Sequence, residues 1–224
     1  MKVLRDPLGR PIDRLYFKIE VLDERCERKI ADFMERHGGG FRLPIPTSEL
    51  IRMIVAEAGA LDLYADLPEG VDGYTDYFTD RNPNVKISQR LAATRYHNRL
   101  RFTLAHEYGH VWFHAPLWRK SEEDPTRPAT PCWTCYRDTI GNAPENDWME
   151  WQADHLGGAL LMPRSYLFAW AGEIAMREGK IPPLQADSDL GRAVMQRVMR
   201  RCQVSEQAAR VRLLRLGLLI ETPT

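Results

Sequence analysis

Residues 94–116, TRYHNRLRFTLAHEYGHVWFHAP, hold four of the chain's six histidines. Two of them, His106 and His110, enclose Glu107 in the pattern HExxH. Residues four apart on a helix lie about 40° apart around the axis and one turn apart along it, so both imidazoles can bind one Zn²⁺. Glu107 can then act on a water at that metal. The spacing therefore predicts a zinc site with a general base beside it.

The other two histidines of this stretch do not fit the same metal site. His114 lies eight residues from His106, about 12 Å along a helix axis, and His97 lies about two and a half turns upstream. We expect both to have structural or supporting roles. A metzincin would carry a glycine and a third histidine where this chain has Phe113 and Pro116, which excludes that class.

A catalytic zinc needs a third protein ligand. The helix predicted over residues 146–162 is the natural donor, because one of its faces carries Glu150, Ala153, Asp154 and Gly157. Its small residues would let two backbones approach and bring Glu150 to the metal, while Asp154 could accept the second ring N–H of a ligand histidine. An exposed acidic stripe between two tryptophans explains the same pattern equally well.

Two motifs, RFTLAHEYGH and the downstream EWQADHLGGALLMP, resemble the ImmA/IrrE family of zinc metallopeptidases over roughly residues 46–163. The resemblance implies that His106, His110 and Glu150 bind one Zn²⁺ per chain and that Glu107 is the general base. It also implies a protein substrate, a helix-turn-helix transcriptional repressor whose cleavage derepresses phage, mobile-element or stress genes. The alternative is a zinc-stabilised regulatory module that binds a repressor or antitoxin without cutting it.

The resemblance leaves the surroundings of the zinc undefined. Candidates for a second oxyanion donor are Tyr96, Tyr108, His97 and His114, each with a structural role as the simpler explanation. We expect the strand at residues 85–88 to receive the substrate backbone by strand addition.

Periodicity in the sequence predicts the elements that position the site. Helices are expected over residues 23–37 and 47–59, the second with an apolar stripe of Ile51, Ile54, Val55 and Ala58. A strand is expected over 61–67, and strands 74–79 and 85–88 flank the turn-rich DRNPN as a hairpin. We assign no regular structure to residues 115–147.

The expected fold is α+β, mainly helical and zincin-like, with a small mixed or antiparallel sheet and a C-terminal extension that resembles a helix-turn-helix. We predict an N-terminal helical segment (1–45), a metallopeptidase domain (46–185) and C-terminal helices (186–224). Residues 192–215 carry seven arginines against one acid, and two hypotheses explain this balance: DNA contact through residues 190–216, or packing against the peptidase domain with the arginines as a solvated face. Ser205 is predicted to cap the last helix, with Val204, Ala208, Val211 and Leu214 as its apolar stripe.

Composition limits which partners, cell compartment and cysteine chemistry we expect. Formal net charge is zero, which gives no overall field toward nucleic acid or membrane. No segment reads as a signal peptide or membrane span, so we expect a cytoplasmic protein without a membrane partner. Cys132 and Cys135 have the spacing of half a zinc knuckle, but no second pair lies near them.

Overall fold

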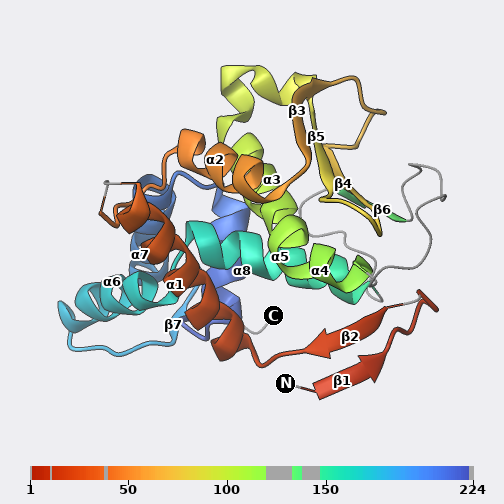
Figure 1. The fold of residues 1–224 in the computed structure, drawn as a ribbon. Helices are drawn as coiled ribbons and strands as arrows, with labels where there is room; N and C mark the ends of the chain where they lie inside the picture. The colour runs from red at the N-terminus through yellow and green to blue at the C-terminus, as the bar shows by residue number, and fades with distance from the viewer. Residues whose placement is uncertain (1, 11, 38–39, 120–132, 138–146, 222–224) are drawn as a thin grey trace. The chain divides into compact units, whose positions relative to one another are not determined.

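The computed structural model describes residues 2–10, 12–37, 40–119, 133–137 and 147–221 (Figure 1). The chain folds into two compact units, residues 1–19 with 47–157 and residues 20–46 with 158–224. The predicted domain boundaries at 45/46 and 185/186 stay predictions.

The helices of the first unit include those that carry the HExxH motif and Glu150. They are α2 (Thr47–Glu57), α3 (His97–Gly109), α4 (Ala115–Trp118) and the part of α5 (Trp148–Leu161) up to Gly157. The turns Gln89–Ala92 and Thr94–Tyr96 are 3₁₀-helical and precede α3, whereas His110–His114 forms a π-helical turn after it. Helix α2 was predicted, but its stripe was partly wrong, since Leu50, Met53 and Ile54 are buried while Val55 is 60% exposed.

A four-stranded mixed sheet lies beside α3 in the first unit (Figure 1). Its strands are β3 (Ala60–Ala65), β4 (Gly73–Tyr77), β5 (Asn84–Ser88) and β6 (Trp133–Arg137), in the order β3-β5-β4-β6. The predicted hairpin is present, because β4 and β5 pair antiparallel, and β5 also pairs parallel with β3. Strand addition at residues 85–88 was a wrong prediction, since β5 has a strand on each side and no free edge.

Sequence periodicity did not reveal the N-terminal hairpin of β1 (Lys2–Arg5) and β2 (Asp13–Tyr16). The loop between these strands is tied to the start of α5 by polar contacts. Arg10 Nε donates to Asp6 Oδ2 at 2.6 Å, and Arg10 Nη1 contacts both carboxylate oxygens of Asp147 at 3.0 and 3.1 Å. Trp148 Nε1 donates to the same Asp6 oxygen at 3.0 Å. These contacts fix the first turn of the helix that carries Glu150.

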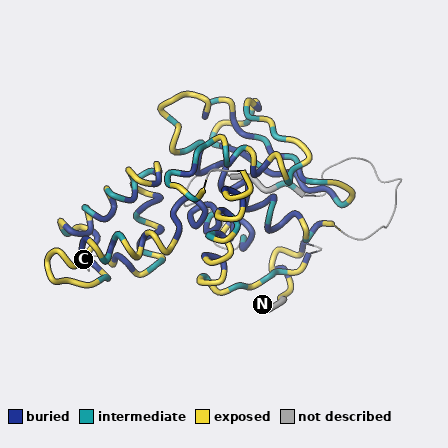
Figure 2. Tube along the Cα trace, turned by 60° about the vertical axis from the view of Figure 1, so that its left-hand side comes forward, coloured by how far each residue is buried: buried dark blue, intermediate teal, exposed yellow. Residues whose placement is uncertain are grey.

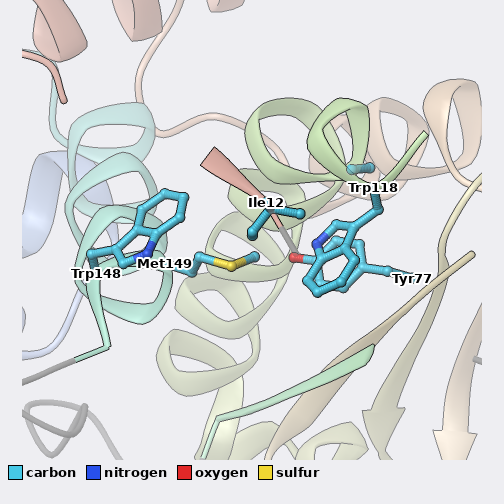
Figure 3. Packing of buried hydrophobic residues seen from close by; sticks show 6 residues of the cluster. Ile12, Tyr77, Trp118, Trp148 and Met149 are labelled. Atoms are coloured by element: carbon cyan, nitrogen blue, oxygen red, sulfur yellow. The ribbon is translucent and has the colours of Figure 1, made fainter. Parts of the chain in front are cut away.

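An apolar cluster packs next to these polar contacts (Figure 3). Tyr77 of β4 stacks on Trp118 with ring centroids 5.4 Å apart. Met149 of α5 lies between that pair and Trp148, and Ile12 lies above it in the view. The cluster thus packs β4, α4 and α5 together through side chains that exclude water.

The second unit is formed mainly by helices. It contains α1 (Ile19–Arg36) from Glu20 onward, α6 (Arg164–Met176), α7 (Asp189–Cys202) and α8 (Glu206–Arg215), with short parallel strands β7 (Leu184–Gln185) and β8 (Leu219–Ile220). Figure 2 shows buried and exposed residues alternating along the helices. In α1, Leu22, Cys26, Ile30 and Phe33 are buried at helical spacing.

For α8, the predicted cap is confirmed and the predicted apolar stripe is partly wrong. Ser205 caps the helix, because its hydroxyl accepts from the Ala208 N–H. The stripe was partly wrong: the buried residues of α8 are Ala208, Ala209, Arg212 and Leu213, whereas Val211 is 37% exposed. The fold tolerates the buried charge of Arg212 because its guanidinium pairs with Asp23 at 2.8 Å.

Helices and small sheets make this a mainly helical α+β fold of the zincin type, as predicted. Within the described residues, no helix has the length and apolar character needed to cross a bilayer. Cys132 and the side chain of Cys135 lie outside the described part of the chain, so the knuckle hypothesis stays untested.

Candidate metal centre

Three buried side chains from two helices converge in the first unit. His106 and His110 come from α3 and the π-helical turn after it, and Glu150 comes from α5. Each offers one ligand atom, and these atoms all lie within 4.8 Å of one another. The three residues are 1%, 1% and 5% exposed. A histidine pair and one carboxylate form a donor set that suits a divalent transition metal.

Small residues let α3 and α5 approach closely enough for this convergence. A Cβ on Gly157 would lie 3.0 Å from the His106 backbone nitrogen, and one on Gly109 would lie 3.3 Å from the Ala153 α-carbon. These glycines therefore permit backbone contact between the helices, as the small residues on the α5 face predicted.

The spacing of the donor atoms fits a metal ion. Tetrahedral ligands at about 2.0–2.1 Å from a zinc lie about 3.3 Å from one another. The two histidine Nε2 atoms are 3.1 Å apart, His106 Nε2 is 3.2 Å from Glu150 Oε2, and His110 Nε2 is 3.3 Å from Glu150 Oε1. Glu150 Oε1 has no hydrogen-bond partner among the described residues, although it is buried. An ion between the three groups would satisfy that oxygen.

Asp154 supports the first histidine from one turn along α5. Its Oδ1 lies 2.9 Å from His106 Nδ1. A carboxylate oxygen accepts, so the His106 Nδ1–H donates, and in the neutral ring the Nε2 lone pair then faces Glu150 and His110. This contact fixes both the tautomer and the ring orientation of His106.

Burial and neighbouring charge act in opposite directions on Glu150. Burial raises the pKa of its carboxyl, but the charge and the ring N–H groups of His110 and His106, when these rings are protonated, outweigh burial and hold the pKa well below its usual range. Glu150 is therefore an ionised, acceptor-only group at neutral pH.

Glu107 lies on α3, next to His106 in the sequence, and points toward β4. Its Oε2 accepts a hydrogen bond from Thr75 Oγ1 at 2.6 Å, while its buried Oε1 has no hydrogen-bond partner among the residues described. Burial raises the pKa of Glu107, an effect that His106, His110 and the Thr75 hydrogen bond offset only in part. A raised pKa suits a carboxylate that must take up and release a proton near neutral pH.

A second chain of polar contacts begins behind His110. Its Nδ1 lies 2.8 Å from Tyr77 Oη and 3.0 Å from His114 Nδ1. His114 Nε2 lies 3.1 Å from Gln152 Oε1, and Gln152 Nε2 donates to the Leu15 carbonyl at 2.7 Å. The π-helical turn His110–His114 places the two histidines for this contact, and such turns are frequent at functional sites.

The comparison with known protein families decides which class this arrangement belongs to. Residues 56–214 match a peptidase family model described as the IrrE N-terminal-like domain. The chain belongs to this family. No curated protein matches the chain.

As a member of the IrrE-like peptidase family, the chain has a metallopeptidase-like role, and its buried His106, His110 and Glu150 can hold a metal ion. Two of the candidate oxyanion donors, Tyr108 and His97, differ in their surroundings. Tyr108 Oη donates to Glu57 Oε1 at 2.8 Å, and His97 is exposed.

Sequence reasoning missed Thr75, Tyr77 and Gln152. The first two lie on β4, more than thirty residues before the motif residues that they contact, Glu107 and His110. Strand alternation says nothing about which helix a strand faces. Gln152 could have been proposed from the sequence as a residue near the site, since it lies two residues after Glu150 on α5.

Proposed function

We propose that this protein is a zinc-dependent endopeptidase in which His106, His110 and Glu150 hold one Zn²⁺ and Glu107 is the general acid and base. The convergence of two imidazoles and one ionised carboxylate, with Glu107 adjacent in sequence to His106, carries the proposal. A zinc held by these three residues would supply Lewis-acid chemistry, polarising the scissile carbonyl and lowering the pKa of a bound water.

The chain's own residues then move the protons. Glu107 takes a proton from the attacking water and delivers it to the amine nitrogen that leaves the peptide. Thr75 holds the Oε2 atom of Glu107 through its 2.6 Å hydrogen bond, which leaves Oε1 for this exchange. Asp154 keeps His106 in the tautomer that ligates.

The proposed substrate is a helix-turn-helix transcriptional repressor whose cleavage derepresses phage, mobile-element or stress genes. This proposal follows from the ImmA/IrrE resemblance and family membership. The direct test incubates the zinc-loaded protein with a helix-turn-helix repressor, the first choice being one encoded in a neighbouring gene, and separates the products by mass spectrometry. One defined cleavage that disappears with a chelator supports the proposal.

Glu107→Gln is the matched control, because it preserves shape and hydrogen-bonding capacity but cannot take the proton. It should bind zinc as wild type does and cleave at least about 100-fold more slowly. Cleavage at the wild-type rate by zinc-loaded Glu107→Gln would refute the mechanism. Stable capture of the intact repressor by both proteins would favour the regulatory-module alternative.

DNA contact through residues 190–216 is a second proposal, and the exposure of Arg200 and Arg201 on α7 favours it. Arg212 cannot take part, because it is buried against Asp23. Binding of duplex DNA by the full chain that weakens steeply with salt and is lost in Arg200→Ala/Arg201→Ala would support it.

A further inference from the structure

His110 has two partners at its Nδ1 atom, and only one assignment of protons leaves its other nitrogen free for a metal. If Nδ1 carries the proton, the Nε2 lone pair faces His106 and Glu150. If Nδ1 is bare, Nε2 carries the proton and cannot ligate. The residues behind His110 therefore decide whether it is a competent ligand.

The backbone carbonyl of Leu15 can only accept a hydrogen bond, and this fixes the direction of the hydrogen bonds that follow. Gln152 must point its amide nitrogen at this oxygen, 2.7 Å away, so its own Oε1 faces His114. Because Oε1 is also an acceptor, the His114 Nε2 atom, 3.1 Å away, carries a proton. A backbone oxygen on β2 thus determines the orientation of a side chain on α5.

The second step fixes the other nitrogen of His114. Its ring is 0% exposed, and its two nitrogens contact an imidazole and an amide oxygen, neither of which compensates a buried positive charge. The ring is therefore neutral, and with Nε2 protonated its Nδ1 is an acceptor. His110 Nδ1, 3.0 Å away, must donate to it.

We propose that His114 and Gln152 are positioning residues that hold His110 in its metal-binding tautomer, through a relay from Leu15 O to Gln152, His114 and His110. The oxygen of Tyr77, 2.8 Å from His110 Nδ1, shares the same N–H as a second acceptor. The relay has the same role for His110 as Asp154 has for His106: it accepts the Nδ1–H and so keeps Nε2 free of a proton. The acceptor is a neutral imidazole at His110 and a carboxylate at His106. This inference rests on the proposed metal site but not on the repressor as substrate.

The test measures zinc affinity by competition with a chromophoric chelator. His114→Leu removes the acceptor and should weaken zinc binding about 10- to 100-fold, the usual effect of losing a partner of a ligand histidine. His114→Asn keeps an acceptor oxygen near the former Nδ1 position and should recover most of that loss. Tyr77→Phe keeps the His114 acceptor and should change the affinity less than His114→Leu does.

Gln152→Leu tests the outer step, since it frees the His114 ring to take the opposite tautomer. It should weaken zinc binding in the same direction, although it leaves every proposed ligand and His114 in place. The ¹⁵N NMR spectrum of zinc-loaded wild type, with labelled histidine, provides a readout that requires no substitution. His110 should show a protonated Nδ1, and His114 a protonated Nε2.

Unchanged zinc affinity in His114→Leu, a larger loss in Tyr77→Phe than in His114→Leu, or an unprotonated His110 Nδ1 in zinc-loaded wild type would each overturn the relay. If His114→Leu does not fold, Gln152→Leu and the wild-type spectrum decide the question. Wild type that binds no zinc overturns the metal site itself, and the relay with it. Wild type that binds zinc but cuts no repressor leaves the relay standing and overturns only the substrate.

Discussion

His106 Nδ1 and Asp154 Oδ1 lie 2.9 Å apart, and this contact joins α3 to α5 on the side of the imidazole that faces away from Glu150. This contact sets which nitrogen of His106 carries the proton. Its loss should therefore weaken zinc binding more than it lowers the stability of the fold.

Asp154→Ala should therefore weaken zinc binding about 10- to 100-fold, with a smaller loss in Asp154→Asn, whose amide oxygen still accepts. Chelator competition measures both. Asp32→Ala is a suitable control, because Asp32 is an exposed residue of α1 far from the site in sequence. Wild-type affinity in Asp154→Ala would show that His106 needs no such support.

Thr75→Val should reduce kcat/KM for cleavage while the zinc content stays at the wild-type level. The hydroxyl donates to buried Glu107 Oε2 at 2.6 Å, and a hydrogen bond to a charged group contributes about 1.5–3 kcal/mol, so the loss should reach about 10- to 100-fold. Thr75→Ser keeps the hydroxyl and should recover most of the rate. Equal rates in the two variants would contradict a role for this hydrogen bond.

Asp6 should make the stability of the first unit pH-dependent. Burial raises the pKa of Asp6, but hydrogen bonds from Arg10 and Trp148 outweigh burial, so the folded-state pKa lies below the ordinary value of 3.8. The unfolded chain then takes up the proton first as pH falls. The contribution of Asp6 to stability is therefore complete above about pH 4 and is lost as pH drops through the folded-state pKa.

Urea denaturation of wild type and Asp6→Asn over a pH series measures this effect. The variant should have a lower free energy of unfolding at neutral pH, and its deficit should shrink below about pH 4. A deficit of constant size across the series would show that the charge of Asp6 is not what stabilises the cluster.

Arg212→Met and Arg210→Met compare two arginines of one helix in different surroundings. Arg212 pairs with Asp23, and the two side chains are 3% and 2% exposed, so the substitution removes the charged partner of a buried carboxylate and should cost about 3–5 kcal/mol. Arg210 pairs with Asp187 and Glu221 and is 30% exposed, so its loss should cost at most about 1 kcal/mol. Equal free energies of unfolding would contradict the structural role assigned to Arg212.

Local patterns were sufficient to predict which side chains of α3 and α5 converge. HExxH has a fixed geometry on a helix, and the spacing of Glu150, Ala153, Asp154 and Gly157 defines one face of α5 whatever the rest of the fold does. The Asp154 contact and the close approach at Gly157 follow from that face once two helices pack on each other.

Contacts between distant segments could not be predicted in the same way. Alternation marks β4 as a strand but does not indicate that Thr75 faces Glu107 or that Tyr77 faces His110. The apolar stripes were displaced because burial follows the tertiary partner, so Val55 and Val211 are exposed while Arg212 is buried against Asp23. Strand β5 has no free edge because β3, a strand that was itself predicted, pairs with its other side.

The most direct test of the metal centre is a crystal structure of the zinc-loaded protein with anomalous data collected on both sides of the zinc absorption edge. We expect one zinc peak per chain, within about 2.0–2.2 Å of His106 Nε2, His110 Nε2 and a Glu150 carboxylate oxygen. A zinc peak bound by other residues, or none at these three atoms, would contradict this expectation.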